Sequence, residues 1–212
     1  MQDSNLKDTY FQRKMSIRAG DKLIDLSTPV VMGILNATPD SFYASSRMSS
    51  EKEVLLKTEK MLKDGAGILD VGGYSSRPGA ENISESLEIS RIEPVIKAIS
   101  KEFPEAVISI DTFRSKVAQT AIESGARIIN DISGFQINHE IIDVANRNKV
   151  PYILMHMRGT PQNMIDNTNY ENLFGELASY FSERIKALKE LGLNDIILDP
   201  GFGFAKTVDQ SH

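Results

Sequence analysis

Six side chains that could contact a ligand stand at or near the ends of short apolar runs. They are Asn36, Asp70, Asp111, Asn130, Met155 and Asp199. Carboxylates only accept hydrogen bonds, whereas a carboxamide both donates and accepts them. A flat heterocycle with an amino group, ring N–H groups and a ring nitrogen acceptor needs that combination. A pterin and a guanine both present such an edge, so these residue types narrow the ligand class and leave both rings open.

A structural interpretation competes with this one, because an Asp or Asn after a strand often caps the next helix or shapes a turn. Asp70 is the member of the set most expected to be structural, since Gly72 and Gly73 follow it at once. Asp131 is expected to act as a cap. For the set as a whole, a shared ligand cleft is favoured.

Three loops follow these runs and add ligand-binding groups. Residues 36–42 (NATPDSF) offer small and hydroxyl side chains suited to an anion or a hydrated cation. Residues 72–79 (GGYSSRPG) combine glycines with Arg77, which can contact a phosphate in bidentate fashion. Residues 199–206 (DPGFGFAK) offer a carboxylate, aromatic rings and a cation. The glycine spacing excludes a P-loop and a dinucleotide-binding fingerprint.

The elements that must position these groups alternate regularly along the chain. Strands are expected at 30–35, 68–71, 107–110, 127–129, 151–155 and 195–198. Helices are expected at 51–64, 84–101, 115–125, 138–148 and 170–191, and a hairpin at 15–26. Ser84 should cap its helix, and Pro94 should kink that helix or mark its boundary.

Strands that alternate with helices predict βα units and a parallel sheet. The carboxyl ends of such strands lie on one face, both in a barrel and in an open doubly wound sheet. A TIM-like (β/α)₈ barrel needs eight units, and this chain offers about six. The count alone therefore leaves the two closures open.

Composition excludes several function classes. The net charge of −5 argues against nucleic-acid binding, which needs basic patches. The chain has no cysteine, so disulfides, thiol nucleophiles and Cys-ligated zinc are excluded, and its three histidines are too scattered for a metal site. It has no apolar run of membrane-spanning length. Residues 1–14 are expected to be a flexible extension rather than a secretory signal, and residues 15–212 a single domain.

Six stretches of this sequence resemble the dihydropteroate synthase family, from about residue 15 onward. They are MGILNATPDSF (32–42), DVGGYSSRPGA (70–80), SIDTF (109–113), INDISG (129–134), LMHMRGTP (154–161) and LDPGFGFAKT (198–207). The resemblance implies a TIM-like barrel and a cytoplasmic transferase of folate biosynthesis, the step that sulfonamides target. It condenses 6-hydroxymethyl-7,8-dihydropterin diphosphate with 4-aminobenzoate, giving 7,8-dihydropteroate and pyrophosphate. It also implies Mg²⁺ and, for a full-length protein, a homodimer.

The resemblance also assigns roles to individual positions. The pterin pocket would be formed by Asp111, Asn130, Met155, Asp199 and Lys206. The aminobenzoate site would be formed by Phe42, Ser76, Pro78 and Phe204. Asn36 would lie near pyrophosphate and Mg²⁺, Arg77 near the substrate's phosphate, and Asp111 would stabilise the cation that forms when pyrophosphate leaves. His156 is expected to be a structural histidine.

The chain departs from the family pattern in three places. Tyr74-Ser75-Ser76 replaces Glu-Ser-Thr, and Tyr43-Ala44 replaces the Ser-Asp that commonly follows the first loop's Phe. The family also continues with two further βα units, so the chain is expected to be a fragment whose own activity is doubtful. Two alternatives are a methyltetrahydrofolate-binding methyltransferase domain and an inactive pterin-binding homologue.

Overall fold

Six parallel strands form one sheet in the computed structural model, which describes residues 15–37, 47–75, 82–160 and 163–211. The strands are β3 (Val31–Asn36), β4 (Ala66–Gly72), β5 (Val107–Asp111), β6 (Ile128–Asp131), β7 (Tyr152–Met155) and β8 (Ile196–Asp199). The order is β3-β4-β5-β6-β7-β8, with every neighbouring pair parallel. A doubly wound sheet would reverse its strand order at a switch point. The sequential order therefore favours the barrel among the two predicted closures.

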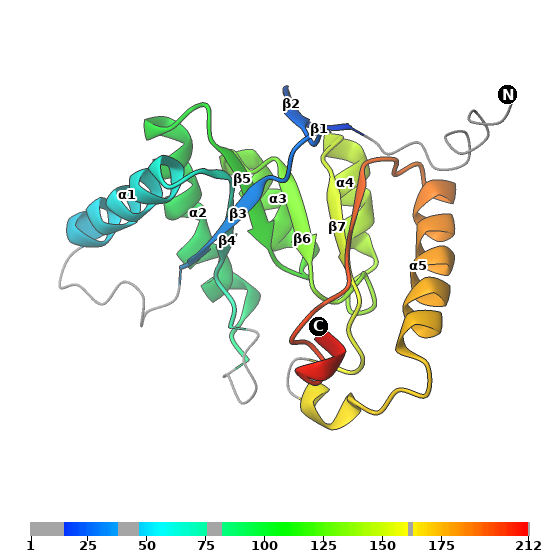
Figure 1. The fold of residues 1–212 in the computed structure, drawn as a ribbon. Helices are drawn as coiled ribbons and strands as arrows, with labels where there is room; N and C mark the ends of the chain where they lie inside the picture. Colours follow the sequence, from blue (N-terminus) through cyan, green and yellow to red (C-terminus); the bar gives the residue numbers. More distant parts are fainter. Residues whose placement is uncertain (1–14, 38–46, 76–81, 161–162, 212) are drawn as a thin grey trace, which may run out of the picture.

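The helices follow the strands as predicted and cover the outer face of the sheet (Figure 1). They are α1 (Arg47–Lys63), α2 (Glu85–Glu102), α3 (Ser115–Ser124), α4 (Glu140–Asn148) and α5 (Leu173–Glu190). Short 3₁₀ turns, η2 (Met164–Asn167) and η3 (Asp209–Ser211), were not predicted. Within the described ranges, no helix is long and apolar enough to cross a membrane.

The main core lies between the sheet and the helices. Alternate strand residues such as Leu69, Ile110 and Leu154 face outward and pack with Ile96 and Ile99 of α2 in one buried cluster. Successive side chains of a strand point to opposite faces, so the residues between them face the interior of the arc. The same alternation that builds the core thus leaves the other face of each strand for the site.

A short hairpin closes the amino end of the interior. It consists of β1 (Ser16–Ala19) and β2 (Lys22–Asp25), and it lies at the opposite end of the sheet from the loops after β7 and β8 (Figure 1). Its apolar residues pack against the first inward residues of the strands. That cluster comprises Ile17, Ala19, Ile24, Ile68, Val107, Ile128 and Ile153. Polar contacts add to it, since Arg127 Nε donates to Asp21 Oδ1 at 3.1 Å.

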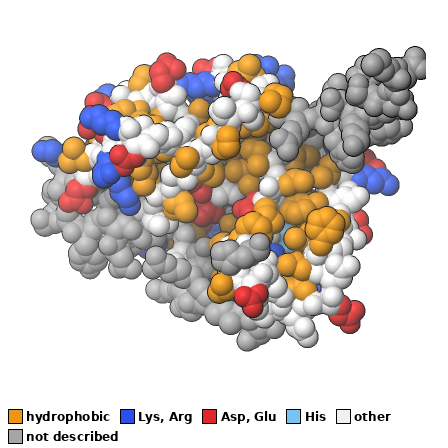
Figure 2. Space-filling model, viewed as in Figure 1, with side chains coloured by type: hydrophobic (Ala, Val, Ile, Leu, Met, Phe, Trp, Pro, Cys, Tyr) orange, Lys and Arg blue, Asp and Glu red, His pale blue; other side chains and the backbone are white. Residues whose placement is uncertain are grey.

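The outer strands of the sheet, β3 and β8, expose apolar side chains. Val31 and Ile34 on β3 are more than half exposed, and Leu198 on β8 is 44% exposed. Figure 2 shows hydrophobic side chains gathered in the middle of the face viewed in Figure 1, with acidic side chains among them. Within the described residues the six strands therefore form an arc rather than a closed cylinder.

Candidate active site

The carboxyl ends of the six strands bring the predicted ligand-binding side chains to one interior. Apolar residues that lie two or four positions earlier on the same strands show which side chains face the interior. These are Met32, Ile68, Val107, Ile128, Ile153 and Ile197, all part of the apolar cluster beneath the site. In phase with them, and therefore facing inward, are Asn36, Asp70, Asp111, Asn130, Met155 and Asp199.

Asp111, Asn130 and Asp70 form the centre of this set. Asp111 and Asn130 stand opposite each other on β5 and β6. Asn130 Nδ2 donates to Asp70 Oδ2 at 2.9 Å. Asp111 Oδ2 would lie 3.3 Å from a Cβ atom at Gly72, so the glycine leaves room for the carboxylate. The prediction that Asp111 and Asn130 converge is confirmed, and Asp70 joins them although it was expected to be structural.

The electrostatic environment of these carboxylates is unusual. Burial raises the pKa of Asp111 well above its ordinary value, and the nearby charges of Asp70, Glu88 and Asp131 raise it further. Burial also raises the pKa of Asp70; hydrogen bonds with the side chains of Ser109 and Asn130 oppose the shift, and the nearby charge of Asp199 adds to it. An interior with several partly desolvated carboxylates favours ligands that bring N–H donors or positive charge.

Asp199 shapes the turn that follows β8. Its Oδ1 accepts a hydrogen bond from Gly201 N at 2.8 Å. Gly201 has a φ of +67°, and a Cβ atom there would lie 2.2 Å from the carbonyl oxygen of His156. Only glycine allows this approach. The turn therefore holds the Gly201–Phe204 segment against the loop that follows β7.

Lys206 also holds the turn after β8 in place. Its buried Nζ lies 3.0 Å from His156 Nδ1 and donates to the carbonyl oxygens of His156, Gly201 and Phe204. Burial lowers the pKa of Lys206 to about 8, and Asp199 opposes the shift. The resemblance placed Lys206 in the pterin pocket; in this structure its polar contacts hold the loop beside that pocket.

Met155 and Phe204 contribute the apolar part of the interior. Met155 is buried and clusters with Ile132, Met157, Met164 and Ala205, and Phe113 and Phe204 pack against them. A flat ring bound between Asp111 and Asp199 would have this cluster beside it. The predicted packing of Met155 on a ligand ring stays a prediction, as does the contact of Phe204 with aminobenzoate.

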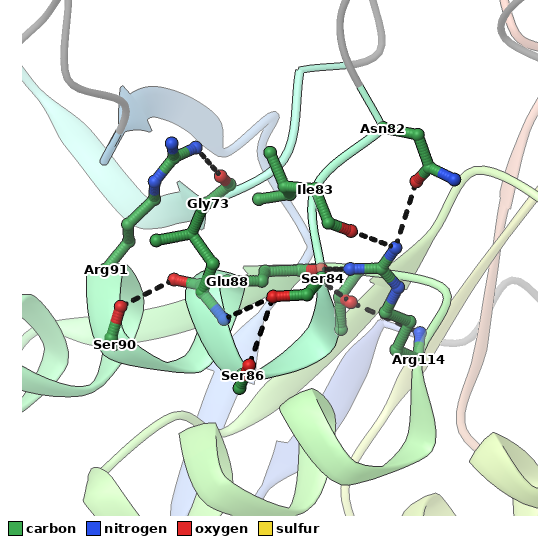
Figure 3. Close-up of polar contacts among 11 residues, drawn as sticks. Gly73, Asn82, Ile83, Ser84, Ser86, Glu88, Ser90, Arg91 and Arg114 are labelled. Atoms are coloured by element: carbon green, nitrogen blue, oxygen red, sulfur yellow. Dashed lines mark hydrogen bonds and ion pairs between the residues drawn. The ribbon is translucent and has the colours of Figure 1, made fainter.

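A buried ion pair supports the strand end that carries Asp111 (Figure 3). Arg114 Nη1 donates to Glu88 Oε2 at 2.6 Å, and Thr112 Oγ1 donates to Glu88 Oε1 at 2.8 Å. Arg114 Nη2 also donates to Asn82 Oδ1 and to the Ile83 carbonyl at 2.8 Å. The side chain of Arg114 thus ties the residues before α2 to the turn after β5.

Arg91 makes a matching contact on the other side of the same loop. Its Nη1 donates to the Gly73 carbonyl at 3.1 Å (Figure 3). The residues on both sides of 76–81 are therefore held by arginines. Ser76, Arg77 and Pro78 lie outside the described residues, as does Phe42, so their predicted roles stay predictions.

Asn36 is the one predicted metal-binding residue. It is exposed at the carboxyl end of β3, where a carboxamide oxygen can serve as a hard ligand. The described residues contain no group of three His, Asp or Glu side chains that could hold a metal ion. Mg²⁺ commonly keeps several waters and takes one or two protein ligands together with substrate phosphates. Asn36 fits that kind of site and does not fit an all-protein cage.

Three features of the site were not anticipated from the sequence: the contact of Asp70 with Asn130, the inward-facing Ser109, and a network around Lys206. The alternation of side chains along β4 places Asp70 in the interior, because it stands two residues after the inward-facing Ile68. Ser109, two residues before Asp111 on β5, also faces inward and is fully buried. His156, which contacts Lys206 through Nδ1, also lies with its Nε2 3.7 Å from Glu176 Oε1 on α5. This network has no signal in the sequence, because its members lie on separate elements.

His156 should make the protein acid-sensitive. Burial lowers the pKa of His156 to about 4, with the positive charge of Lys206 as the next cause. An unfolded histidine binds its proton near pH 6.5, so between about pH 6.5 and 4 the unfolded state holds more protons and stability falls as pH falls. The expected loss is about 3 kcal/mol of unfolding free energy.

Urea unfolding between pH 4 and 7 measures this loss. His156→Asn, whose amide oxygen can replace Nδ1 as the partner of Lys206, should lose less stability over that range than the wild type. The control His139→Asn changes an exposed histidine and should keep the wild-type dependence. Equal slopes for the wild type and His156→Asn would show that His156 does not titrate as argued.

Known proteins are similar to this chain in sequence and in fold. The profile of a family described as "Pterin binding enzyme" matches residues 32–212. A dihydropteroate synthase of Synechocystis is 45% identical over 85% of this chain, and one of Bacillus subtilis is 46% identical over 84%. The chain spans 63% and 60% of the length of these two relatives.

Solved structures of dihydropteroate synthases are similar to this chain in fold. A Yersinia pestis dihydropteroate synthase in complex with a sulfonamide drug superposes with a TM-score of 0.83 and 36% identity, covering 93% of this chain and 71% of its own. A Xanthomonas albilineans dihydropteroate synthase with 4-aminobenzoic acid has a TM-score of 0.83 and 31% identity, covering 93% and 70%. The TIM-like barrel with partial units is therefore the correct fold class.

Proposed function

The chain belongs to the family of pterin-binding enzymes, and from that premise we propose that it acts as a dihydropteroate synthase. The substrates would be 6-hydroxymethyl-7,8-dihydropterin diphosphate and 4-aminobenzoate. The single observation that carries the proposal is the cluster of Asp70, Asp111 and Asn130 beside Asp199 at one end of the sheet. The complex of the Xanthomonas albilineans relative with 4-aminobenzoic acid supports the choice of the second substrate.

The inward carboxylates would hold the pterin ring. Asp111 and Asp199 accept hydrogen bonds from ring N–H and amino groups, and Asn130 can add an acceptor or a donor. Met155 would contact the ring from the apolar side of the pocket. This set orients the ring so that its exocyclic CH₂–O group points toward the loops at the mouth.

Asp111 would then stabilise the charge that develops during the reaction. The C–O bond to pyrophosphate breaks, the electron pair leaves with pyrophosphate, and positive charge spreads from the methylene carbon into the ring. A carboxylate fixed in a desolvated interior stabilises such a cation without reorganising. The amine of 4-aminobenzoate adds to the methylene carbon and loses a proton, which gives dihydropteroate.

The loops would serve the phosphate and the second substrate. Asn36 would hold Mg²⁺, which supplies charge neutralisation to the diphosphate when bound. Arg77 would contact the substrate's phosphate, and Phe42, Ser76, Pro78 and Phe204 would surround 4-aminobenzoate. The family resemblance also supports a homodimer and a cytoplasmic location for this proposal.

Pyrophosphate release tests the proposal. The natural full-length protein and the 212-residue chain are each incubated with both substrates and Mg²⁺, and pyrophosphate and dihydropteroate are measured together. We expect both products in equal amounts from the full-length protein, neither when 4-aminobenzoate is left out, and little or no product from the 212-residue chain. Pterin binding without turnover by the full-length protein would overturn the synthase proposal in favour of a non-catalytic pterin-binding protein. Tight binding of methyltetrahydrofolate without use of the diphosphate would instead support the methyltransferase class.

A further inference from the structure

Asp70 is a buried carboxylate that the proposed reaction does not use. It lies on β4 and is 5% exposed. Its Oδ2 accepts the hydrogen bond from Asn130, and hydrogen bonding with the Ser109 side chain on β5 also lowers its pKa. Burial raises the pKa of the same carboxyl, so these hydrogen-bond partners are what stabilise its ionised form in the interior.

The hydrogen bond of Asp70 reaches across a strand. In the sheet register Asp70 stands opposite Ser109 on β5, and Asn130 lies on β6 beyond it. A bond to the adjacent strand would suffice to hold the sheet together. The longer reach places the Asp70 carboxylate against the amide of Asn130.

That contact decides which way the Asn130 amide faces. A carboxylate only accepts hydrogen bonds, so the amide atom that faces Asp70 must be the nitrogen. The other end of the amide, Oδ1, is buried and unpartnered in the described residues. Asn130 therefore offers an acceptor to whatever enters the interior, beside the acceptors of Asp111 and Asp199.

We propose that Asp70 is a positioning residue that fixes the Asn130 amide with Oδ1 toward the ligand, so that the site selects rings presenting N–H donors. The inference rests on the proposed function only for the identity of the ring. An asparagine at position 70 could donate as well as accept, so it would allow the Asn130 amide both orientations. Discrimination between donor and acceptor rings should then be lost.

The binding of two simple pteridine rings tests this selectivity. Pterin carries an amino group at C2, and pteridin-4(3H)-one carries only a hydrogen atom there while keeping the N–H at N3 and the acceptor at N1. Calorimetric titration of the wild type should show preference for pterin by at least about tenfold, because the buried acceptors lose the amino donors when pteridin-4(3H)-one binds. In Asp70→Asn we expect this preference to fall by about tenfold. The control Asp143→Asn changes an exposed aspartate and should keep the wild-type preference.

A purely structural role would give a different pattern. Asp70→Asn would then lower thermal stability and weaken the binding of both rings equally, and that outcome overturns the proposal.

A double-mutant comparison adds a second criterion. If Asp70 acts through Asn130, the variant Asp70→Asn/Asn130→Ala should bind pterin no more weakly than Asn130→Ala alone. Additive losses would show that Asp70 contacts the ligand itself, which also overturns it.

Failure of the proposed function is separable from failure of this inference. If the wild type binds neither ring, the pterin assignment fails, and the amide of Asn130 can still be examined in the free protein. Its side-chain ¹⁵N–¹H pair, assigned through Asn130→Ala, should shift and exchange faster with solvent in Asp70→Asn. An unchanged pair would show that Asp70 does not hold the amide.

Discussion

Asp111→Asn should lower the affinity for pterin by about 100-fold, because it replaces a charge-assisted hydrogen bond with a neutral one in a buried site. The same change should not reduce stability at neutral pH. Burial and the charges of Asp70, Glu88 and Asp131 disfavour the ionised form of Asp111 in the folded protein. Calorimetric titration and urea unfolding of the same samples measure the two effects.

The pH dependence gives a further check on Asp111. Because the folded pKa of Asp111 is raised, this carboxyl holds more protons in the folded state than in the unfolded state between about pH 4 and its folded pKa, and its contribution to stability falls as pH rises through that window. In Asp111→Asn this contribution disappears. Asp143→Asn serves as the control, because Asp143 is exposed and lies on α4. Wild-type pterin affinity in Asp111→Asn would contradict the proposed pocket.

Arg114→Met should reduce the unfolding free energy by about 3–5 kcal/mol, since it leaves the Glu88 charge buried without its cation. The side chain of Glu88 is 1% exposed and that of Arg114 is 15% exposed. Burial already raises the pKa of Glu88, and Thr112 and Arg114 oppose the shift. Urea unfolding with linear extrapolation measures the loss.

Removing both charges separates the pair from its packing. In Glu88→Leu/Arg114→Met most of the stability should return, because a buried pair replaced by apolar side chains is often close to neutral. Lys116→Met is the matched control, since Lys116 on α3 pairs with Glu85 on α2 and remains 78% exposed. It should cost less than about 0.5 kcal/mol. A double variant as unstable as Arg114→Met would show that burial of an unpaired charge is not the cause.

The helices were predictable where capping and periodicity agreed. Ser84 caps α2 as predicted, accepting from Leu87 N at 3.2 Å. The helix nevertheless continues through Pro94, where a kink or a boundary was expected. The buried side chains of Ile92, Ile96 and Ile99 flank the proline, and packing of this face outweighs the lost hydrogen bond.

The start of the last helix shows the opposite case. The prediction began it at Tyr170, and α5 begins at Leu173 because Asn172 accepts from Gly175 N at 2.9 Å. The spacing of apolar residues does not reveal a cap of this kind. Gly192, which follows α5, has a φ of +92°, in the left-handed region that favours glycine.

The site was predictable as far as strand ends reveal it. Asp111, Asn130 and Asp199 were predicted from position alone to share one interior, and their roles toward a ligand stay predictions. Asp131 was expected to act as a cap, but it shapes the turn after β6 by accepting from Ser133 N and Phe135 N, and His139 stands at the N-cap of α4. Asp70 was expected to be the most structural member of the set, and it stands inside β4, which extends to Gly72, where its carboxylate accepts a hydrogen bond from Asn130. Its partner lies two strands away, and sequence spacing does not contain the register that joins them.

The hairpin beneath the barrel sets an order of events during synthesis on the ribosome. Residues Asp21 and Arg127 are separated by 106 positions, and the apolar partners of Ile17 and Ile24 include Ile153. At roughly 5–20 residues per second, Ile17 and Ile24 wait at least several seconds before their partners emerge. The hairpin is therefore translated well before this cluster can be completed, and its two isoleucines lack part of their apolar partners until then.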